Sequence, residues 1–225
     1  MKKRILVFLT FIFFISGYAQ EGKLKPTQSQ GVQAGKSNFH GGIRAGFTGS
    51  LITGDGFPFQ GFNKFGAFAG VFVNFPVSKN GKWLIQPELN FVMKGCKHSP
   101  KNDKDGNQQG NSYKLQLMYG EIPLIVKWRF FKGFELELGP SFGILFKNKN
   151  VEEVDGYTNV GAPPFSRFEF AGIVGVGYLF FNHLGVNLRY EASFLPVRKP
   201  KGADRYFLSR GQHNQSFCFS VYYQF

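Results

Sequence analysis

Acidic and basic residues recur at alternate positions of several apolar segments, and their types and spacing could do chemistry. Buried ions are costly alone, but they are tolerable when each is paired within a satisfied network. We therefore predict a network of ion pairs that fills a protein interior; the alternative is a path that conducts ions. The residues of this network are Arg44, Glu88, Lys94, Glu121, Lys127, Arg129, Glu135, Glu137, Arg167, Glu169, Arg189 and Glu191.

Nucleophilic and metal chemistry find little support in the sequence. Serines lie near His98 and His213, but no serine, histidine and acid stand in an order typical of a catalytic triad. The metal-binding spacings H-x-x-x-H and C-x-x-C are missing, and the run from Asn102 to Gly106 has an incomplete series of calcium ligands. We predict no catalytic residue, no metal site and no cofactor.

The charged residues must be positioned by strands, and the clearest strand signal is the segment 134–146. Large apolar residues stand at its even positions from Phe134 to Phe146, and charged or small residues such as Glu135 and Glu137 stand between them. A period of two over this length indicates a strand longer than the ~5–6 residues usual in soluble proteins and long enough, at ~9–11 residues, to cross a bilayer. We expect lipid on the apolar side and a polar interior on the other.

Apolar and polar residues alternate in a similar way in seven further segments. The connections between successive segments are alternately long and short. This asymmetry is typical of outer-membrane barrels, which have long external loops and short periplasmic turns. We predict an all-β protein, an eight-stranded antiparallel transmembrane up-and-down β-barrel that spans residues 39–225. The expected strands are 39–48, 65–75, 83–95, 113–130, 134–146, 166–181, 184–194 and 215–225.

A soluble eight-stranded barrel would have the same periodicity with its apolar side chains inside. The interior of eight strands is barely wide enough for its own side chains, and roughly forty large apolar residues would not fit there. We therefore expect lipid outside. Aromatic residues that gather near the short turns, including Trp83, Trp128 and Tyr222, agree with an interfacial girdle.

Two local features are expected within the strands. In the segment 113–130 the outward apolar parity runs through Leu115, Leu117 and Tyr119 and then switches to Ile122 and later residues, which predicts a bulge near 120–123. Cys96 is expected in an external loop and Cys218 inside the last strand. We predict two independent thiols, and a disulfide between them is the alternative.

The N-terminal residues have the pattern of an export signal. Basic residues 2–4, an apolar core from Ile5 to Ile15 and small residues before Gln20 predict a signal peptide at 1–19. Residues 20–38 are polar and predict a flexible periplasmic leader. No run of ~18 apolar residues occurs after the signal peptide, so no transmembrane helix is predicted. We therefore expect the protein in the outer membrane.

The net charge of the whole chain is +13. In an exported barrel this excess favours anionic lipid headgroups as partners over nucleic acid. The last long loop is strongly basic and could contact the phosphates of lipopolysaccharide; a generic basic loop is the equally weighted alternative. Its basic residues are Arg198, Lys199, Lys201, Arg205 and Arg210.

The segments 119–128 and 135–140, with the sequence Glu-Ile-Pro-Leu in the first, resemble the outer-membrane β-barrel domain common in Bacteroidota. That group includes the PorT-like proteins, some of which serve the type IX secretion system. The resemblance covers about residues 39–225. It implies an outer-membrane location and an eight-stranded barrel, with no catalytic residues to carry over. The terminal Phe225 is similar to the signal that the barrel assembly machinery reads.

Together these observations lead to an expected function and two alternatives. We expect a structural or accessory component of an envelope or secretion complex, with partner proteins in that complex. The first alternative is a stand-alone barrel that binds external ligands or lipopolysaccharide, or that forms a narrow pore for small solutes. The second is a lipid-modifying enzyme, the weakest of the three, because no catalytic constellation is evident.

Overall fold

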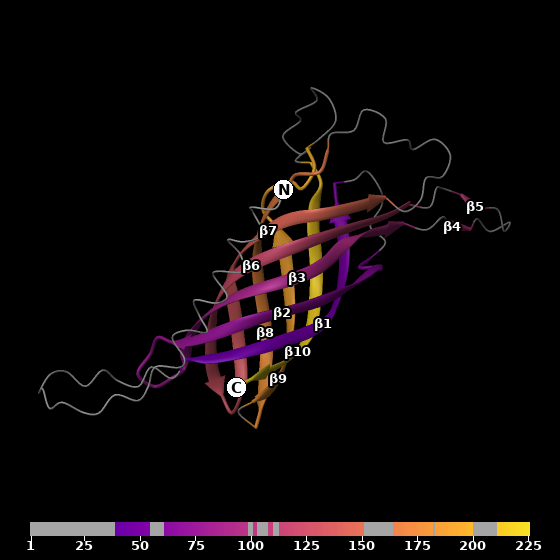
Figure 1. Cartoon of the computed structure of the whole chain (residues 1–225). Coiled ribbons are helices and arrows are strands. Elements are labelled where there is room, and N and C mark those ends of the chain that lie inside the picture. The colour runs from indigo at the N-terminus through magenta and orange to yellow at the C-terminus, as the bar shows by residue number, and fades with distance from the viewer. Residues whose placement is uncertain are drawn as a thin grey trace, which may run out of the picture. The chain divides into compact units, whose positions relative to one another are not determined.

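Eight long antiparallel strands close into a barrel in the computed structural model, which describes residues 39–54, 61–98, 101–102, 108–109, 113–150, 164–181, 183–199 and 211–225 (Figure 1). The expected signal peptide and leader lie outside these residues, as does most of the incomplete calcium-like run. The strands are β1 (His40–Thr53), β2 (Lys64–Pro76), β3 (Trp83–His98), β6 (Tyr113–Phe131), β7 (Phe134–Asn150), β8 (Phe168–Phe180), β9 (Leu184–Ser193) and β10 (His213–Gln224). A further short pair, β4 (Lys101–Asn102) and β5 (Gln108–Gln109), lies between β3 and β6.

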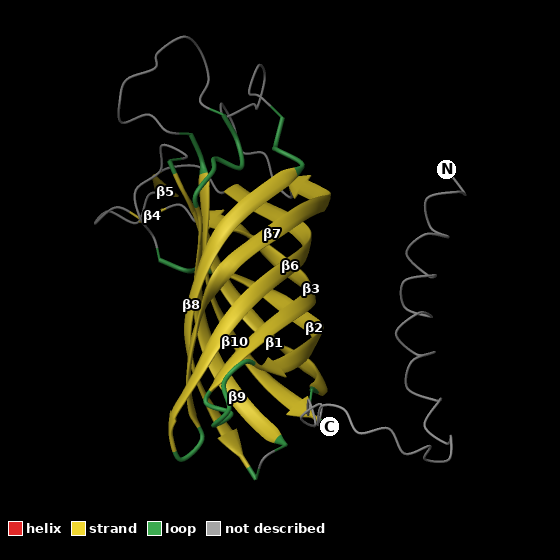
Figure 2. Cartoon of the chain, turned by 90° about the vertical axis from the view of Figure 1, so that its left-hand side faces the viewer, coloured by secondary structure: helices red, strands yellow, loops and turns green. Residues whose placement is uncertain are grey.

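The barrel closes where its first and last long strands pair. β1 pairs with β10 from Gly42 opposite Gln224 to Thr53 opposite His213, and every other long strand pairs with its neighbours in the chain (Figure 2). Because the barrel is closed, no strand edge is open. The backbone N–H and C=O groups along each strand pair with neighbouring strands and do not need water as a partner. No helix long and apolar enough to cross a membrane occurs in the described part of the chain.

The predicted alternation of side chains is confirmed on most strands. On β7, Leu138 and Phe142 are 63% and 57% exposed on the outer face, whereas Glu135 and Glu137 are buried inside. On β2, where phenylalanines occupy both parities, Phe68 is buried and points inward, whereas Phe65 is exposed. Apolar side chains therefore cover the outer surface, and charged ones lie in the lumen.

The strand β6 departs from the prediction. Leu115, Leu117 and Tyr119 were expected to face outward, but they are 1%, 0% and 0% exposed and lie inside the barrel. β6 keeps one parity, and the irregularity falls earlier: Met118 pairs with Lys147 and Tyr119 with Leu145, which leaves an extra residue on β7. The expected switch near 120–123 is therefore wrong.

These inward side chains form an apolar layer in the lumen near the long loops. The layer consists of Leu115, Leu117 and Tyr119 together with Ile52 and Cys96, and Leu145 and Phe165 pack against it. An apolar side chain is compatible with either lipid or such a layer, which is why hydrophobicity alone misassigned these positions. Hereafter this set is called the apolar layer.

The two cysteines lie on strands and are both buried. Cys96 belongs to β3, so its expected placement in an external loop is wrong. Cys96 packs in the apolar layer, whereas Cys218 on β10 packs with Phe68 and Val92. The two thiols are not bridged.

A charge introduced on the outer face tests the membrane placement of the barrel. We expect Leu138→Arg to lower the free energy of unfolding by about 2–4 kcal/mol, the cost of an arginine near the bilayer midplane, and Phe131→Arg beside a short turn to cost about 0–1 kcal/mol. Urea titration of the barrel folded into phosphatidylcholine vesicles measures both values. Equal costs at the two positions would contradict a hydrocarbon environment for Leu138.

Candidate functional site in the charged lumen

The lumen contains two clusters of charged side chains at different heights. The turn-side cluster, nearer the short turns, comprises Arg44, Glu88, Lys127, Arg129, Glu135, Glu137 and Arg189. The loop-side cluster, nearer the long loops, comprises Lys94, Glu121, Glu169 and Glu191. The strands position both, because every second residue of a strand points inward.

Glu88 lies at the centre of the turn-side cluster. Its carboxylate accepts hydrogen bonds from Arg44 Nη1 at 2.8 Å and from Arg189 Nη1 and Nη2 at 2.8 and 2.7 Å. The side-chain amides of Gln86 and Asn90 also donate to it. Arg189 in turn donates through Nε to Glu137 at 2.5 Å. A carboxylate between two guanidinium groups is the arrangement that makes a buried ion pair tolerable.

The same cluster continues toward the short turns. Lys127 Nζ lies 3.0 Å from Glu135 and 2.9 Å from Glu137, and Arg129 Nε lies 2.7 Å from Glu135. Tyr222 was expected in the interfacial girdle, but its side chain is buried and donates a 2.8 Å hydrogen bond to Glu135. Gly185 makes this placement feasible, because a Cβ there would lie 2.1 Å from Tyr222 Cζ.

The loop-side cluster surrounds a single ammonium group. Lys94 Nζ lies 2.6 Å from Glu121, 2.9 Å from Glu191 and 3.4 Å from Glu169. Asn214 donates a 3.1 Å hydrogen bond to Glu169. One ammonium against three carboxylates leaves a formal charge of −2, whereas four cations against three carboxylates leave the turn-side cluster at +1.

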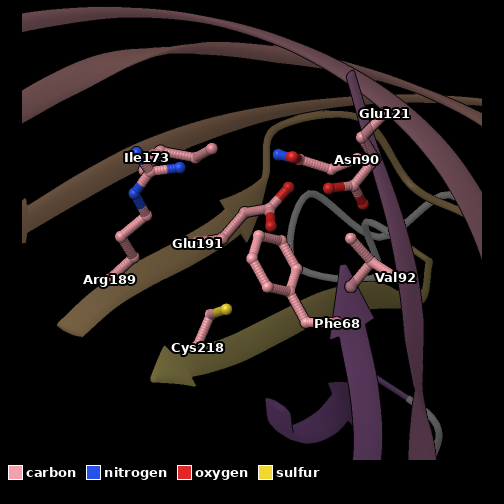
Figure 3. Close-up of a pocket in the computed structure, with 8 residues that line it drawn as sticks. All are labelled: Phe68, Asn90, Val92, Glu121, Ile173, Arg189, Glu191 and Cys218. Atoms are coloured by element: carbon pink, nitrogen blue, oxygen red, sulfur yellow. The ribbon is translucent and has the colours of Figure 1, made fainter. Parts of the chain in front are cut away.

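A small pocket lies between the two clusters. Figure 3 shows the carboxylates of Glu121 and Glu191 and the amide of Asn90 directed into it. Arg189 lines its turn-side wall, and the remaining lining residues are Phe68, Val92, Ile173 and Cys218. The pocket therefore has both a charged and an apolar wall.

All residues of the predicted network except one belong to these clusters. The exception is Arg167, which is exposed and stands in a bend before β8, so its expected inward orientation is corrected. The predicted network did not include Tyr222 or Asn187. The Asn187 side chain links Arg44 with Glu137 at 2.9 and 3.1–3.2 Å. The inward parity of Asn187 was a signal for it, but the position of Tyr222 among aromatics concealed its role.

The predicted basic loop is only partly described. Arg198 is 9% exposed, and its guanidinium carbon lies 4.8 Å from the centroid of the Phe165 ring. Lys199 is exposed, and Lys201, Arg205 and Arg210 lie outside the described residues. At the other end of the barrel, the backbone nitrogen of Phe225 donates to Gly41 at 2.9 Å; its role as an assembly signal stays a prediction.

The sequence was expected to contain no G-x-S-x-G motif, but Gly-Pro-Ser-Phe-Gly at 139–143 matches this pattern. In serine hydrolases this motif places the nucleophile on a sharp turn between a strand and a helix. Here Ser141 lies within β7, is 1% exposed and has no hydrogen-bond partner for its hydroxyl. The position does not have the geometry of a nucleophile elbow.

Closed antiparallel strands with an apolar outer face and a charged lumen define an outer-membrane β-barrel protein. Residues 18–198 match the family model described as outer membrane protein beta-barrel domain, and the chain belongs to this family. The match does not reach the PorT-like or Bacteroidota level that the resemblance named. Comparison with curated proteins gave no significant match.

Among solved structures the chain is similar to several small outer-membrane proteins. Ail of Yersinia pestis, in complex with the heparin analogue sucrose octasulfate, is 15% identical, with a TM-score of 0.46, and the alignment covers 83% of this chain and 99% of that one. Neisserial surface protein A is 11% identical at a TM-score of 0.45, covering 83% and 97%. OprG from Pseudomonas aeruginosa is 13% identical at 0.40, covering 85% and 98%.

Removing one carboxylate tests the energetics of the turn-side cluster. Glu137→Ala leaves Arg189 and Lys127 partly uncompensated, and we expect the free energy of unfolding to fall by about 3–5 kcal/mol. Ser141→Ala is the matched control on the same strand and face. We expect it to change the free energy of unfolding little, because the Ser141 hydroxyl has no hydrogen-bond partner. Urea titration in vesicles measures both, and equal stability of Glu137→Ala and the wild type would refute the network.

Proposed function

We propose that this protein is a closed barrel that anchors its external loops at the cell surface and does not conduct solutes through its lumen. The observation that carries the proposal is the filling of the lumen at successive heights. The turn-side cluster, the loop-side cluster and the apolar layer follow one another from the short turns toward the long loops.

Each level closes the lumen by a different interaction. In the turn-side cluster, Arg44 and Arg189 meet Glu88 from different strands, so ion pairs cross the lumen. In the apolar layer, Leu117 and Tyr119 are 0% exposed, whereas a water-filled path would leave such side chains wet. An interior of eight strands has little room beyond its own side chains. We therefore favour a function of the external loops or the periplasmic turns over the transport of solutes through the lumen.

Planar-bilayer recording tests the closed lumen. We expect no conductance steps from the wild type, because paired ions and apolar side chains fill its interior. Glu137→Ala and Arg189→Ala open the turn-side cluster, and Glu121→Ala, Leu117→Ala and Tyr119→Ala open the other two levels. A variant with all five changes should introduce steps. Heat-dependent migration on a denaturing gel checks that the variant is folded. Wild-type steps as large as those of the variant would overturn the proposal.

We further propose that the external end contacts lipopolysaccharide phosphates through the basic loop after β9. Lys199 is exposed where this loop begins, and Lys201, Arg205 and Arg210 follow it in the sequence. Clustered cations attract phosphate groups. We assign Arg198 a role in packing and not in phosphate contact, because its guanidinium is buried against Phe165.

An accessory role in an envelope or secretion complex is the second candidate. It is supported by the resemblance of segments 119–128 and 135–140, and by the exposed aromatic rings at the short turns. Phe181 is 90% exposed and has a φ of 48°, an uncommon conformation for a residue other than glycine. Phe131 is 58% exposed beside the turn between β6 and β7. Such rings could contact a periplasmic partner.

One purification from gently solubilised outer membranes separates these roles. We expect the wild-type barrel to retain lipopolysaccharide, and the variant with Lys199, Lys201, Arg205 and Arg210 all changed to Gln to retain less, because fewer cations face the phosphates. The matched control changes Lys79, Lys82 and Lys132 at the short turns to Gln. Equal retention by both variants would refute the loop contact. A protein copurifying in stoichiometric amount would favour the accessory role, and a barrel recovered alone would contradict it.

A further inference from the structure

Three lysines form a cationic patch on the outer wall of the barrel near the long loops. Lys97 lies near the end of β3, Lys114 near the start of β6 and Lys147 toward the end of β7, and these strands are neighbours in the barrel (Figure 2). Lys97 is directly opposite Lys114 in the strand register, and Lys147 is opposite Met118. Lys97 and Lys147 are exposed, and Lys114 is half-buried. Hereafter these three lysines are called the wall patch.

The alternation of the strands directs these side chains away from the lumen. On β6, Leu115 and Leu117 are buried in the apolar layer, so the even-numbered residues of this part of the strand face outward. Lys97 and Lys147 lie opposite even-numbered residues of β6, and directly opposite residues share a face of the sheet. The whole patch therefore belongs to the outer surface of the barrel.

The wall patch has no carboxylate side chain to balance it in the part of the chain that the structure describes. The glutamates there are all buried in the lumen, and they are Glu88, Glu121, Glu135, Glu137, Glu169 and Glu191. Like charges directly opposite each other destabilise a pair of strands, and Lys97 and Lys114 are such a pair. An anion between their ammonium groups would offset this repulsion. The patch therefore favours a negatively charged partner outside the barrel.

The wall patch lies at the level where the outer leaflet has its headgroups. A tilted strand crosses the hydrocarbon in about 9–11 residues. Counted along β6 from Trp128 near the short turn, this number of residues ends near Met118 and leaves Lys114 beyond the hydrocarbon. Lys147, opposite Met118, can extend its long side chain toward the headgroups.

Apolar side chains continue the same wall toward the middle of the membrane. Phe146 is 69% exposed, and its ring covers Gly120. Ile122 and Ile144 are 51% and 45% exposed. Phe91, which lies opposite Gly120, is 40% exposed. A molecule on this wall would meet ammonium groups at one end and apolar side chains at the other, a combination that fits a phosphorylated lipid better than a soluble anion.

The spacing of the lysines suits a lipid with two phosphates. Lys97 and Lys114 form one cationic position, and Lys147 forms the other. Lys114 is four residues from Met118, which is opposite Lys147, so about 13 Å of strand separates the two positions at a rise of ~3.4 Å per residue. Lipid A, the membrane anchor of lipopolysaccharide, has a phosphate at each end of a disaccharide and several acyl chains. Its phosphates can meet both positions while its acyl chains cover the apolar wall.

We propose that the wall patch binds the phosphates of one lipid A molecule in the outer leaflet, with Phe91, Ile122 and Phe146 against its acyl chains. This site is separate from the basic loop after β9. That loop joins β9 and β10, and β6 lies on the opposite side of the barrel from β10. The proposal rests on the membrane placement of the barrel and not on the loop contact.

Site-resolved acetylation of the wild-type barrel tests the proposal. The full mature barrel in dodecyl maltoside is treated with an amine-reactive acetylating reagent, with and without diphosphorylated lipid A, and the acetylated lysines are located by mass spectrometry. We expect lipid A to protect the three lysines of the wall patch, because its phosphates contact their ammonium groups. Acetylation of Lys79, Lys82 and Lys132 at the short turns should not change.

A triple variant measures what the wall patch contributes to binding. Changing its three lysines to Gln should weaken the binding of lipid A at least about tenfold in native mass spectrometry, because every lysine near an anionic headgroup adds attraction. The matched control changes the three turn lysines to Gln. It removes the same charge and should bind lipid A as tightly as its parent.

Both triple variants are made in the barrel whose loop cations at positions 199, 201, 205 and 210 are already Gln, so that the loop does not contribute. Heat-dependent gel migration identifies any variant that fails to fold, and the acetylation of the wild type then decides. A loop contact that fails and a wall patch that fails are therefore distinguishable, because each is measured with the other absent or resolved by position.

Three results would overturn the proposal. Unchanged acetylation of the wall patch in the presence of lipid A would show that no lipid occupies it. Equal weakening by the two triple variants would mean that net charge alone attracts the lipid. Equal protection of the wall patch by phosphatidylglycerol or by inorganic phosphate would mean that the patch does not select a diphosphorylated lipid.

Discussion

The absence of water around the membrane-spanning wall is the constraint on which this structure depends. Backbone groups in hydrocarbon must find partners within the protein, and pairing of β1 with β10 completes this for the wall. The side chains inside obey the same rule. Ions such as Glu88 and Lys127 lie in the lumen with partners from neighbouring and facing strands, because an unpaired ion there would destabilise the fold.

Closure of the wall and filling of the lumen depend on each other. A barrel of eight strands is so narrow that side chains from opposite walls meet: Arg189 on β9 reaches Glu88 on β3, on the opposite side of the barrel. Small residues make room for the larger groups. Tyr222 reaches Glu135 past Gly185, where any larger residue would collide with its ring. The polar interior is thus a packed core built from ions and aromatic rings.

Much of this architecture follows from the sequence, because a barrel wall imposes a period of two. The segment 134–146 and the outward phenylalanines of β10 have one apolar parity, and the structure has the predicted orientation there. The prediction was wrong for Leu115, Leu117 and Tyr119, since an apolar side chain can face lipid or an apolar layer in the lumen. Only the fold distinguishes these two environments.

The network residues were predictable for the same reason, and their partners were not. A charge on the inward parity must lie in the lumen, which placed Glu88 and Arg189 correctly. Which ions meet depends on the stagger of the strands, and that is not visible in a single sequence. Arg167 was misplaced because β8 begins at Phe168, two residues later than predicted. The excess charge around Lys94 became apparent only when the clusters were separated.

The closed lumen is tested most directly by the two native thiols. Cys96 lies in the apolar layer and Cys218 lines the pocket between the clusters, and both are buried. A membrane-impermeant maleimide added to the folded barrel in vesicles should label neither thiol, and should label both after unfolding in denaturant. Labelling of either cysteine in the folded barrel as fast as in the unfolded chain would contradict a filled lumen.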